Sequence, residues 1–268
     1  MRAGIDPMTF PSPRILILGG THEASRLATI LANNRDLTVI TSLAGRLSQP
    51  HLPAGIVRIG GFGGPDGLTS YLREEAISAV LDVTHPFAAQ ISRNAEQACR
   101  NLDVPLLAFE RPAWERVEGD LWMHVADVPA AAALVNKWNH RIFLSIGRQQ
   151  VGAFAECRDA WFLIRAIDYP TDPLPPRSKL ILERGGFDLQ SELKMLREES
   201  IEILITKNSG GTVTYPKIEA ARKLGIRVIM IDRPAAPNHS TFSDLGKLVG
   251  GLAQVLESSA IMRSIDAI

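Results

Sequence analysis

The architecture can be inferred first from Arg14-Ile-Leu-Ile-Leu-Gly-Gly20, a short apolar run that ends in two glycines. A helical pattern follows over Glu23–Leu31, so this segment indicates a buried strand, a tight turn and a helix. Further apolar strands are predicted over Leu37–Ile40, Ile77–Val83 and Leu106–Phe109, with helical patterns between them. This alternation favours an α/β fold in which helices cover both faces of a parallel sheet.

The same order of elements returns in the second half of the chain. Arg141-Ile-Phe-Leu-Ser-Ile-Gly147 is similar to the opening strand, and Leu72–Ile77 is similar to Leu196–Ile201 at a shift of 124 residues. At a shift of 122, residues 98–112 match residues 220–234. Isolated β-α-β units resemble one another by physics alone, but three matches in the same order favour an internal duplication. We therefore expect two related domains, 14–136 and 137–268, that hold ligands between them.

Composition and charge restrict the classes of partner. Apolar residues make up 46% of the 268 residues and charged residues 22%, which is typical of a globular protein. The formal net charge is zero, so neither nucleic acid nor a membrane surface is an expected partner. Residues 1–136 carry a formal charge of −3 and residues 137–268 carry +3. The second half is therefore the better host for an anion.

Cysteine usage and hydropathy indicate the cellular compartment of the protein. Cys99 and Cys157 are the only cysteines and lack the spacing of a metal site, which fits a reducing compartment. No apolar run approaches the ~20 residues that cross a bilayer. Residues 1–13 contain three prolines and no apolar segment, so we interpret them as a flexible leader. These features predict a cytoplasmic protein without a metal site.

Two loops of the first half are candidates for binding a cofactor. Gly19, Gly20 and Thr21 would let backbone approach a phosphate at a helix N-terminus, although a turn that binds nothing has the same pattern. Ser42 and Arg46 follow the second strand, where dinucleotide-binding folds meet the adenosine ribose. A hydroxyl and a guanidinium without an acidic residue suit a 2′-phosphate, which favours NADP over NAD. A solvated loop arginine is the alternative.

A histidine follows the buried strand 77–83. His85 precedes Pro86, and a residue before proline is held extended, so its side chain should project beyond the strand end. It could donate to a carboxylate or shuttle a proton. A helix-capping or core histidine would show the same pattern.

Cations gather on loops of the second half. Lys207-Asn-Ser-Gly-Gly-Thr212 combines a lysine, hydroxyls and paired glycines, which suits an anion, but it lacks the order of a P-loop. Arg148 and Arg184 also lie on loops at or near strand ends. One loop arginine is usually solvated, whereas three cations in such places predict an anion site.

Five motifs together resemble the precorrin-6A reductase family, over residues 14–234. They are Ile-Leu-Gly-Gly-Thr-x-Glu (17–23), Asp-Val-Thr-His-Pro-Phe-Ala (82–88), Glu-Arg-Pro-Ala-Trp (110–114), Ser-Ile-Gly-Arg-Gln (145–149) and Thr-Lys-Asn-Ser-Gly-Gly (206–211). The resemblance implies two Rossmann-like domains with the active site in a cleft between them. It also implies that NADPH gives hydride to one carbon of a conjugated tetrapyrrole, in the pathway to cobalamin, while a proton adds to the neighbouring atom.

The resemblance implies roles for the candidate residues, although the glycine turn departs from the G-x-G-x-x-G fingerprint. The cofactor would be bound by Gly19, Gly20, Thr21, Glu23, Ser42, Arg46 and Thr84. The carboxylates of the substrate would be bound by His85, Arg148, Arg184, Lys207, Ser209, Gly210 and Gly211. The proton would come from His85 or from water, and transient contacts with neighbouring pathway enzymes are expected. Two other readings stay open: a non-catalytic NADP-sensing module and a transferase with a nucleotide-activated donor.

Overall fold

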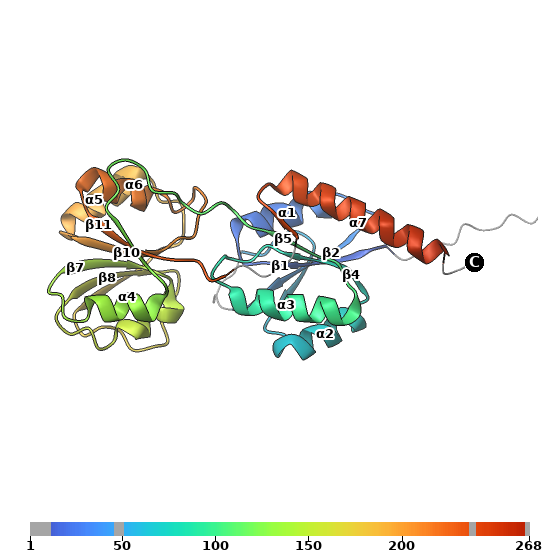
Figure 1. Cartoon of the computed structure of the whole chain (residues 1–268), viewed down its shortest axis with the longest axis horizontal. Helices are drawn as coiled ribbons and strands as arrows, with labels where there is room; N and C mark the ends of the chain where they lie inside the picture. Colours follow the sequence, from blue (N-terminus) through green and yellow to red (C-terminus); the bar gives the residue numbers. More distant parts are fainter. Residues whose placement is uncertain (1–11, 46–50, 236–239, 266–268) are drawn as a thin grey trace, which may run out of the picture. The chain divides into compact units, whose positions relative to one another are not determined.

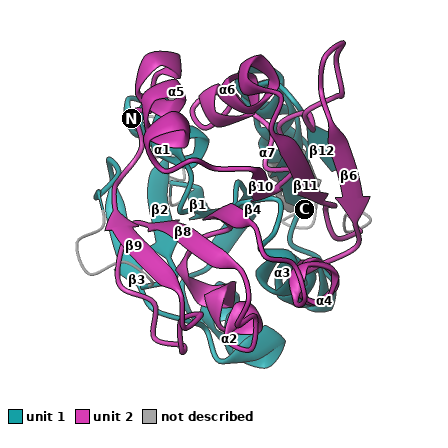
Figure 2. Cartoon of the chain, turned by 90° about the vertical axis from the view of Figure 1, so that its left-hand side faces the viewer, with its two compact units in different colours: residues 1–110, 237–268 teal, residues 111–236 magenta. Residues whose placement is uncertain are grey.

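The computed structural model describes residues 12–45, 51–235 and 240–265, with side chains up to residue 258. Most of the predicted leader and Arg46 therefore lie outside the described residues. The chain forms two compact units, unit 1 with residues 1–110 and 237–268 and unit 2 with residues 111–236 (Figure 2).

Unit 1 is built on a parallel sheet of six strands in the order β12-β5-β4-β1-β2-β3 (Figure 1). The strands are β1 (Arg14–Leu18), β2 (Thr38–Leu43), β3 (Ile56–Ile59), β4 (Ile77–Asp82), β5 (Leu106–Phe109) and β12 (Ser240–Phe242). One face packs against α1 (His22–Ala32) and α7 (Leu245–Ile265), the other against α2 (Gly64–Glu74) and α3 (Ala89–Leu102). Alternate residues of β1 enter the two cores, Ile15 and Ile17 on one side, Leu16 and Leu18 on the other.

Unit 2 repeats this plan with the strand order β6-β11-β10-β7-β8-β9. The strands are β6 (Trp122–Val125), β7 (Arg141–Ser145), β8 (Trp161–Ala166), β9 (Ser178–Leu182), β10 (Ile203–Lys207) and β11 (Arg227–Ile231). Helices α5 (Leu189–Glu198) and α6 (Pro216–Leu224) lie on one face, with α4 (Val128–Val135) on the other (Figure 1). A 3₁₀-helix, η1 (Arg148–Phe154), follows β7 and contacts α4.

The predicted repeat is confirmed down to single backbone conformations. Ala76 and Ser200, 124 positions apart, both have positive φ, at 47° and 48°. Asp103 and Gly225, 122 positions apart, are the left-handed C-caps of α3 and α6. Each sheet has its strands in the order of a Rossmann fold, so the predicted pair of Rossmann-like halves is also confirmed.

The predicted domain boundaries, 14–136 and 137–268, are wrong, because the halves exchange their sixth strands. Strand β6 pairs with β11, so β6 and α4 belong to unit 2, although they precede residue 137. Strand β12 pairs with β5, so β12 and α7 belong to unit 1. The sequence repeat shows where the pattern of elements restarts, which differs from where the chain passes from one unit to the other. The chain has already entered unit 2 at residue 111, and it returns to unit 1 at residue 237.

Candidate active site

The glycine turn of unit 1 lies where strand order reverses, between β1 and β4. The Gly19 N–H donates to the Ser42 carbonyl at 2.9 Å, and a Cβ at Gly19 would lie 2.9 Å from the Thr41 methyl carbon. Gly20 has φ of 106°, and a Cβ there would meet nothing within 4 Å. Beside this turn, the Thr41 hydroxyl is buried without a hydrogen-bond partner among the described residues. The turn therefore leaves backbone open to a ligand and has an unsatisfied polar atom next to it.

Thr21 fixes the start of α1 against the next strand. Its hydroxyl accepts from the Ala24 N–H at 3.1 Å and donates to the Val83 carbonyl at 2.7 Å. Glu23 lies in the first turn of α1 and is half-buried. The remaining N–H groups of that turn face the carboxyl edge of the sheet, the usual place for phosphate.

Ser42, at the end of β2, is 6% exposed and has a neighbour that sequence reasoning missed. Arg58 of β3 is its register partner, and the Arg58 Nη1 donates to the Ser42 Oγ at 3.4 Å. Arg58 also donates to the carbonyls of Gly60 and Gly61, at 2.6 and 2.7 Å. The available signal was an arginine two residues before the glycine-rich run 60–64.

Thr84 and His85 follow β4, and hydrogen bonds fix the orientation of their side chains. The Thr84 N–H and hydroxyl both donate to the Asp82 Oδ1, at 3.0 and 2.7 Å, so the Thr84 hydroxyl can offer a ligand only an acceptor. The Phe87 N–H donates to the His85 Nδ1 at 3.2 Å. A nitrogen that accepts cannot carry the ring proton, so this contact assigns the proton of neutral His85 to Nε2.

In unit 2 the loop after β10 is held by residues near both places where the chain passes between the units. The Ser209 carbonyl accepts from the Arg111 Nε at 2.7 Å and from the Arg233 Nη2 at 3.1 Å. The Gly211 carbonyl accepts from the Trp114 Nε1 at 2.7 Å. Arg111 and Arg233 are equivalent in the internal repeat, a signal that sequence reasoning did not use. The motif 110–114 thus shapes the predicted anion loop.

Glycine is required in that loop for space as well as for backbone angle. Gly210 and Gly211 have φ of 68° and 73°. A Cβ at Gly210 would lie 2.1 Å from the Pro112 carbonyl oxygen. Asn208 completes the arrangement, because its amide accepts from the Trp114 N–H and donates to the Trp114 carbonyl.

The three predicted cations of unit 2 follow three strands of its sheet. Arg148 begins η1 after β7, and its Nη1 donates to the Tyr169 carbonyl at 3.1 Å. Arg184 is exposed in the loop after β9, and Lys207 is the half-buried last residue of β10. Because parallel strands end at one edge of a sheet, the structure brings all three to the same edge.

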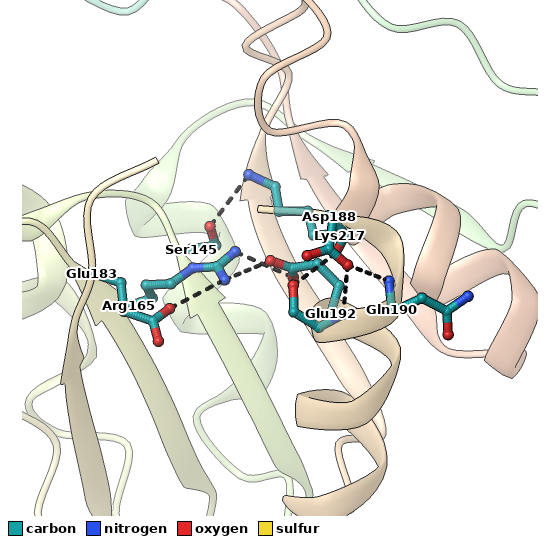
Figure 3. A network of polar contacts seen from close by, with 8 residues as sticks. Ser145, Arg165, Glu183, Asp188, Gln190, Glu192 and Lys217 are labelled. Atoms are coloured by element: carbon teal, nitrogen blue, oxygen red, sulfur yellow. Dashed lines mark hydrogen bonds and ion pairs between the residues drawn. The ribbon is translucent and has the colours of Figure 1, made fainter. Parts of the chain in front are cut away.

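Beneath that edge lies a buried ion pair that the sequence analysis missed (Figure 3). Arg165 of β8 contacts both carboxylate oxygens of Glu192 of α5, at 2.6 and 3.3 Å, and the side chains are 6% and 1% exposed. The Arg165 guanidinium also stacks 3.7 Å from the ring centroid of Phe187, in the loop that carries Arg184. The pair therefore supports one of the cation-bearing loops from below.

Lys217, in the first turn of α6, is 4% exposed and donates to the Ser145 Oγ at 3.3 Å (Figure 3). Burial, and then the positive charge of Arg165, lower the pKa of Lys217 to about 7, against the opposing effect of Glu192. Both protonation states are therefore populated near neutral pH. The signal was available in the repeat, since Leu68 and Ala95 of unit 1 correspond to Glu192 and Lys217.

Within the described ranges, no group of three or more metal-ligating side chains gathers. In that same part of the chain, no helix is both long and apolar enough to cross a bilayer.

Most of the chain matches the model of a known family. Residues 14–253 match the family model described as "Precorrin-6x reductase CbiJ/CobK". The chain belongs to the precorrin-6x reductase family. This confirms the resemblance that the five motifs indicated, and the match extends to residue 253, within α7.

Relatives within the precorrin-6x reductase family cover nearly the whole chain. A precorrin-6A reductase from Rhodococcus erythropolis is 51% identical over 224 residues, 84% of this chain and 90% of the relative. One from Rhodobacter capsulatus is 44% identical over 241 residues, 90% and 96% of the two chains. A solved structure, "CobK precorrin-6A reductase", is 43% identical, with a TM-score of 0.84 over 91% of this chain and 97% of that one.

Proposed function

We propose that this chain catalyses the NADPH-dependent reduction of a ring double bond of precorrin-6A, in the biosynthesis of cobalamin. The observation that carries the proposal is the 44–51% identity, over at least 84% of the chain, to relatives named precorrin-6A reductase. The cation-bearing edge of unit 2 supports it, because a tetrapyrrole carries many carboxylates around its rim.

The residues of unit 1 fit a dinucleotide phosphate. Gly19 and Gly20 leave backbone accessible, and α1 starts at the same edge with Thr21 as its cap. NADPH bound there would supply the hydride, and the protein would position it and exclude water. Ser42 and Arg46 would lie near the adenosine ribose, and Glu23 and Thr84 near the same ligand.

The residues of unit 2 suit the substrate. Arg148, Arg184 and Lys207 would pair with carboxylates, each charge-assisted contact contributing roughly 1.5–3 kcal/mol. The loop 209–211 would present backbone N–H groups, in a shape that Arg111, Arg233 and Trp114 fix before any ligand arrives.

His85 would contact the substrate through Nε2, which carries the ring proton in the neutral side chain. In that state it donates a hydrogen bond. Delivering a proton would require the imidazolium, and forming it would break the contact from the Phe87 N–H. Solvent is the alternative proton source. Contacts with other enzymes of the pathway stay a prediction.

The direct test incubates the purified protein with NADPH and precorrin-6A and follows loss of nicotinamide absorbance together with formation of the dihydro product. We expect stoichiometric oxidation. Cobalt-precorrin-6A is tested in parallel, because relatives named for that substrate are 23–26% identical to this chain. Cofactor binding without hydride loss to either corrinoid would instead support the NADP-sensing module.

Two variants separate the binding sites. Lys207→Ala should raise KM for the corrinoid about tenfold or more and leave NADPH affinity nearly unchanged, because it removes one charge-assisted contact. Arg46→Ala should weaken NADPH binding far more than NADH binding. A collapse of cofactor binding in Lys207→Ala would assign that loop to the other ligand.

A further inference from the structure

We propose that Arg58, on β3, binds the 2′-phosphate of the adenosine ribose and thereby selects NADPH over NADH. This inference rests on the proposed function and adds to it a specificity residue that lies outside the five family motifs. It identifies the ligand group by its chemistry, a phosphate monoester next to an adenosine.

Arg58 lies where a residue can contact the 2′ position of the adenosine ribose. In Rossmann-like sheets the adenosine ribose lies at the end of the second strand. Ser42 is the second-last residue of the second strand here, β2. Arg58 is the register partner of Ser42 on the adjacent strand, with Nη1 3.4 Å from the Ser42 Oγ. A hydroxyl and a guanidinium thus stand together at the place where an acidic residue would favour NAD.

The guanidinium is held in place before any ligand arrives. It donates to two consecutive carbonyls, Gly60 and Gly61, and its carbon lies 3.8 Å from the ring centroid of Phe62. Tyr71 lies further away, with its ring centroid at 5.1 Å. A planar group held by ring faces and fixed acceptors loses little freedom when it binds an anion.

The positive charge of Arg58 has no anionic partner among the residues that the structure describes. The three contacts above engage both N–H groups of Nη1 and one of Nη2, all with neutral acceptors. The Nε–H has no described partner and is not sealed from solvent. The N–H groups of Nε and Nη2 form the side-on fork that pairs phosphate oxygens bidentately.

The contrast with unit 2 shows how such a charge is otherwise neutralised. Arg165 occupies the position equivalent to Ser42 in the second sheet, and Glu192 pairs with it bidentately. The counterpart of Glu192 in unit 1 is Leu68, fully buried in the apolar core. Unit 1 thus keeps an arginine in the same layer and has no carboxylate in that place to neutralise it.

The loop beside Arg58 leaves room for a ligand. Gly60, Gly63 and Gly64 have φ of 125°, 80° and 91°, and a Cβ at any of them, or at Gly61, would meet nothing within 4 Å. Four glycines in five residues therefore present bare backbone next to the guanidinium. Bare backbone of this kind permits close approach by a phosphate or a ribose.

The experiment measures dissociation constants of NADPH, NADH, adenosine 2′,5′-bisphosphate and AMP for the full chain and for Arg58→Ala and Arg58→Lys. We expect Arg58→Ala to weaken NADPH and the bisphosphate about 10- to 100-fold and to change NADH and AMP less than about threefold. Arg58→Lys should fall between, because the charge remains and the fork is lost. Arg100→Ala is the matched control, an exposed arginine of α3 paired only within its helix, and should change nothing.

Each other outcome overturns the inference. Equal losses for NADPH and NADH would mean that Arg58 only holds the loop 60–64. Unchanged selectivity in Arg58→Ala would leave the 2′-phosphate to other residues. Failure of the proposed function is separate, because it would appear in the unmodified protein as an absence of NADPH binding or of precorrin-6A reduction.

Discussion

The two units have the same strand order, yet they differ sharply in the layer where their strands end. In unit 1 this layer contains Leu18, Leu68 and Ala95, all buried in one apolar core. In unit 2 the corresponding positions hold Ser145, Glu192 and Lys217. The fold itself does not need charge there, since the apolar version of the same layer packs well in the same chain. The packing of this layer therefore does not require the charges of unit 2, and burying them carries a desolvation cost.

The largest effect is expected from removing one partner of the buried ion pair. Glu192→Ala removes the buried carboxylate of Arg165 and leaves only that of exposed Glu183, at 3.8 Å. Loss of one partner of a buried pair typically costs about 3–5 kcal/mol. Chemical denaturation should show this loss. Leu68→Ala is the matched substitution in unit 1 and should cost about 2–5 kcal/mol through a cavity instead.

The double variant Arg165→Leu/Glu192→Leu makes the comparison stricter. Replacing both charges by apolar residues should restore most of the stability, as unit 1 suggests, while corrinoid reduction stays impaired. A double variant as unstable as Glu192→Ala would show that the pair stabilises the fold by itself.

The glycine loops of the two units should respond differently to an added methyl group. Gly210→Ala places a Cβ against the Pro112 carbonyl at a left-handed φ, so we expect a loss of about 3 kcal/mol and a large rise in KM for the corrinoid. Gly20→Ala meets no atom within 4 Å and should cost only the backbone strain, about 1–2 kcal/mol. Thermal unfolding of both variants measures the difference, and equal losses would contradict it.

Lys217 should make the stability of the protein depend on pH in the neutral to alkaline range. Its pKa is about 7 in the folded state and lies near 10.4 when the chain is unfolded, so between these values the unfolded state binds more protons. The contribution of Lys217 to stability should therefore rise with pH across that window, by on the order of 1 kcal/mol per pH unit, whereas the raised pKa of Cys99, about 12, acts in the opposite direction above about pH 9. The charged groups acting on Lys217 are Arg165, Glu192 and Arg111.

The measurement compares the unmodified chain with Lys217→Met, because other groups also titrate in alkaline solution. The difference between the two unfolding free energies should favour the variant most below pH 7 and shrink toward pH 10. A difference that stays constant with pH would show that Lys217 keeps the same charge in both states.

The smallest effect concerns the helix caps that the repeat relates. Asp103 and Gly225 both adopt the left-handed conformation, which glycine accepts without strain. Asp103→Gly should stabilise the protein and Gly225→Asp should destabilise it, each by about 0.5–1 kcal/mol. Changes of the same sign in denaturant titrations would contradict the equivalence of the two caps.

Local patterns were sufficient to predict the repeat and several strands near the centre of each sheet, but not β3, β8 or β9. The strand predicted over Leu106–Phe109, for example, has the same bounds in the structure, because its apolar run is bounded by turn signals. The exchange of β6 and β12 could not be predicted in this way. Both are short edge strands of mostly exposed or half-buried residues, and the sheet that such a strand joins depends on distant pairing.

The loop residues of the candidate site stay a prediction, and the side chains that hold those loops in place were missed. Lys207 and the glycines after it carry a recognisable pattern, whereas Arg111 and Arg233 act on that loop from distant segments. Glu192 and Lys217 were missed because charged residues in amphipathic helices usually face solvent. Aligning the two halves would have exposed them, since their counterparts are Leu68 and Ala95.

The crossing of strands between the sheets sets an order in which the protein can be completed during synthesis. Unit 2 is one continuous stretch, so all of its strands have been made once the ribosome has passed residue 236. Unit 1 starts earlier but lacks its edge strand until residues 240–242 have emerged. The part of the chain made first is thus the last to be finished, and a cut between the halves at residue 136 would leave each sheet without one strand.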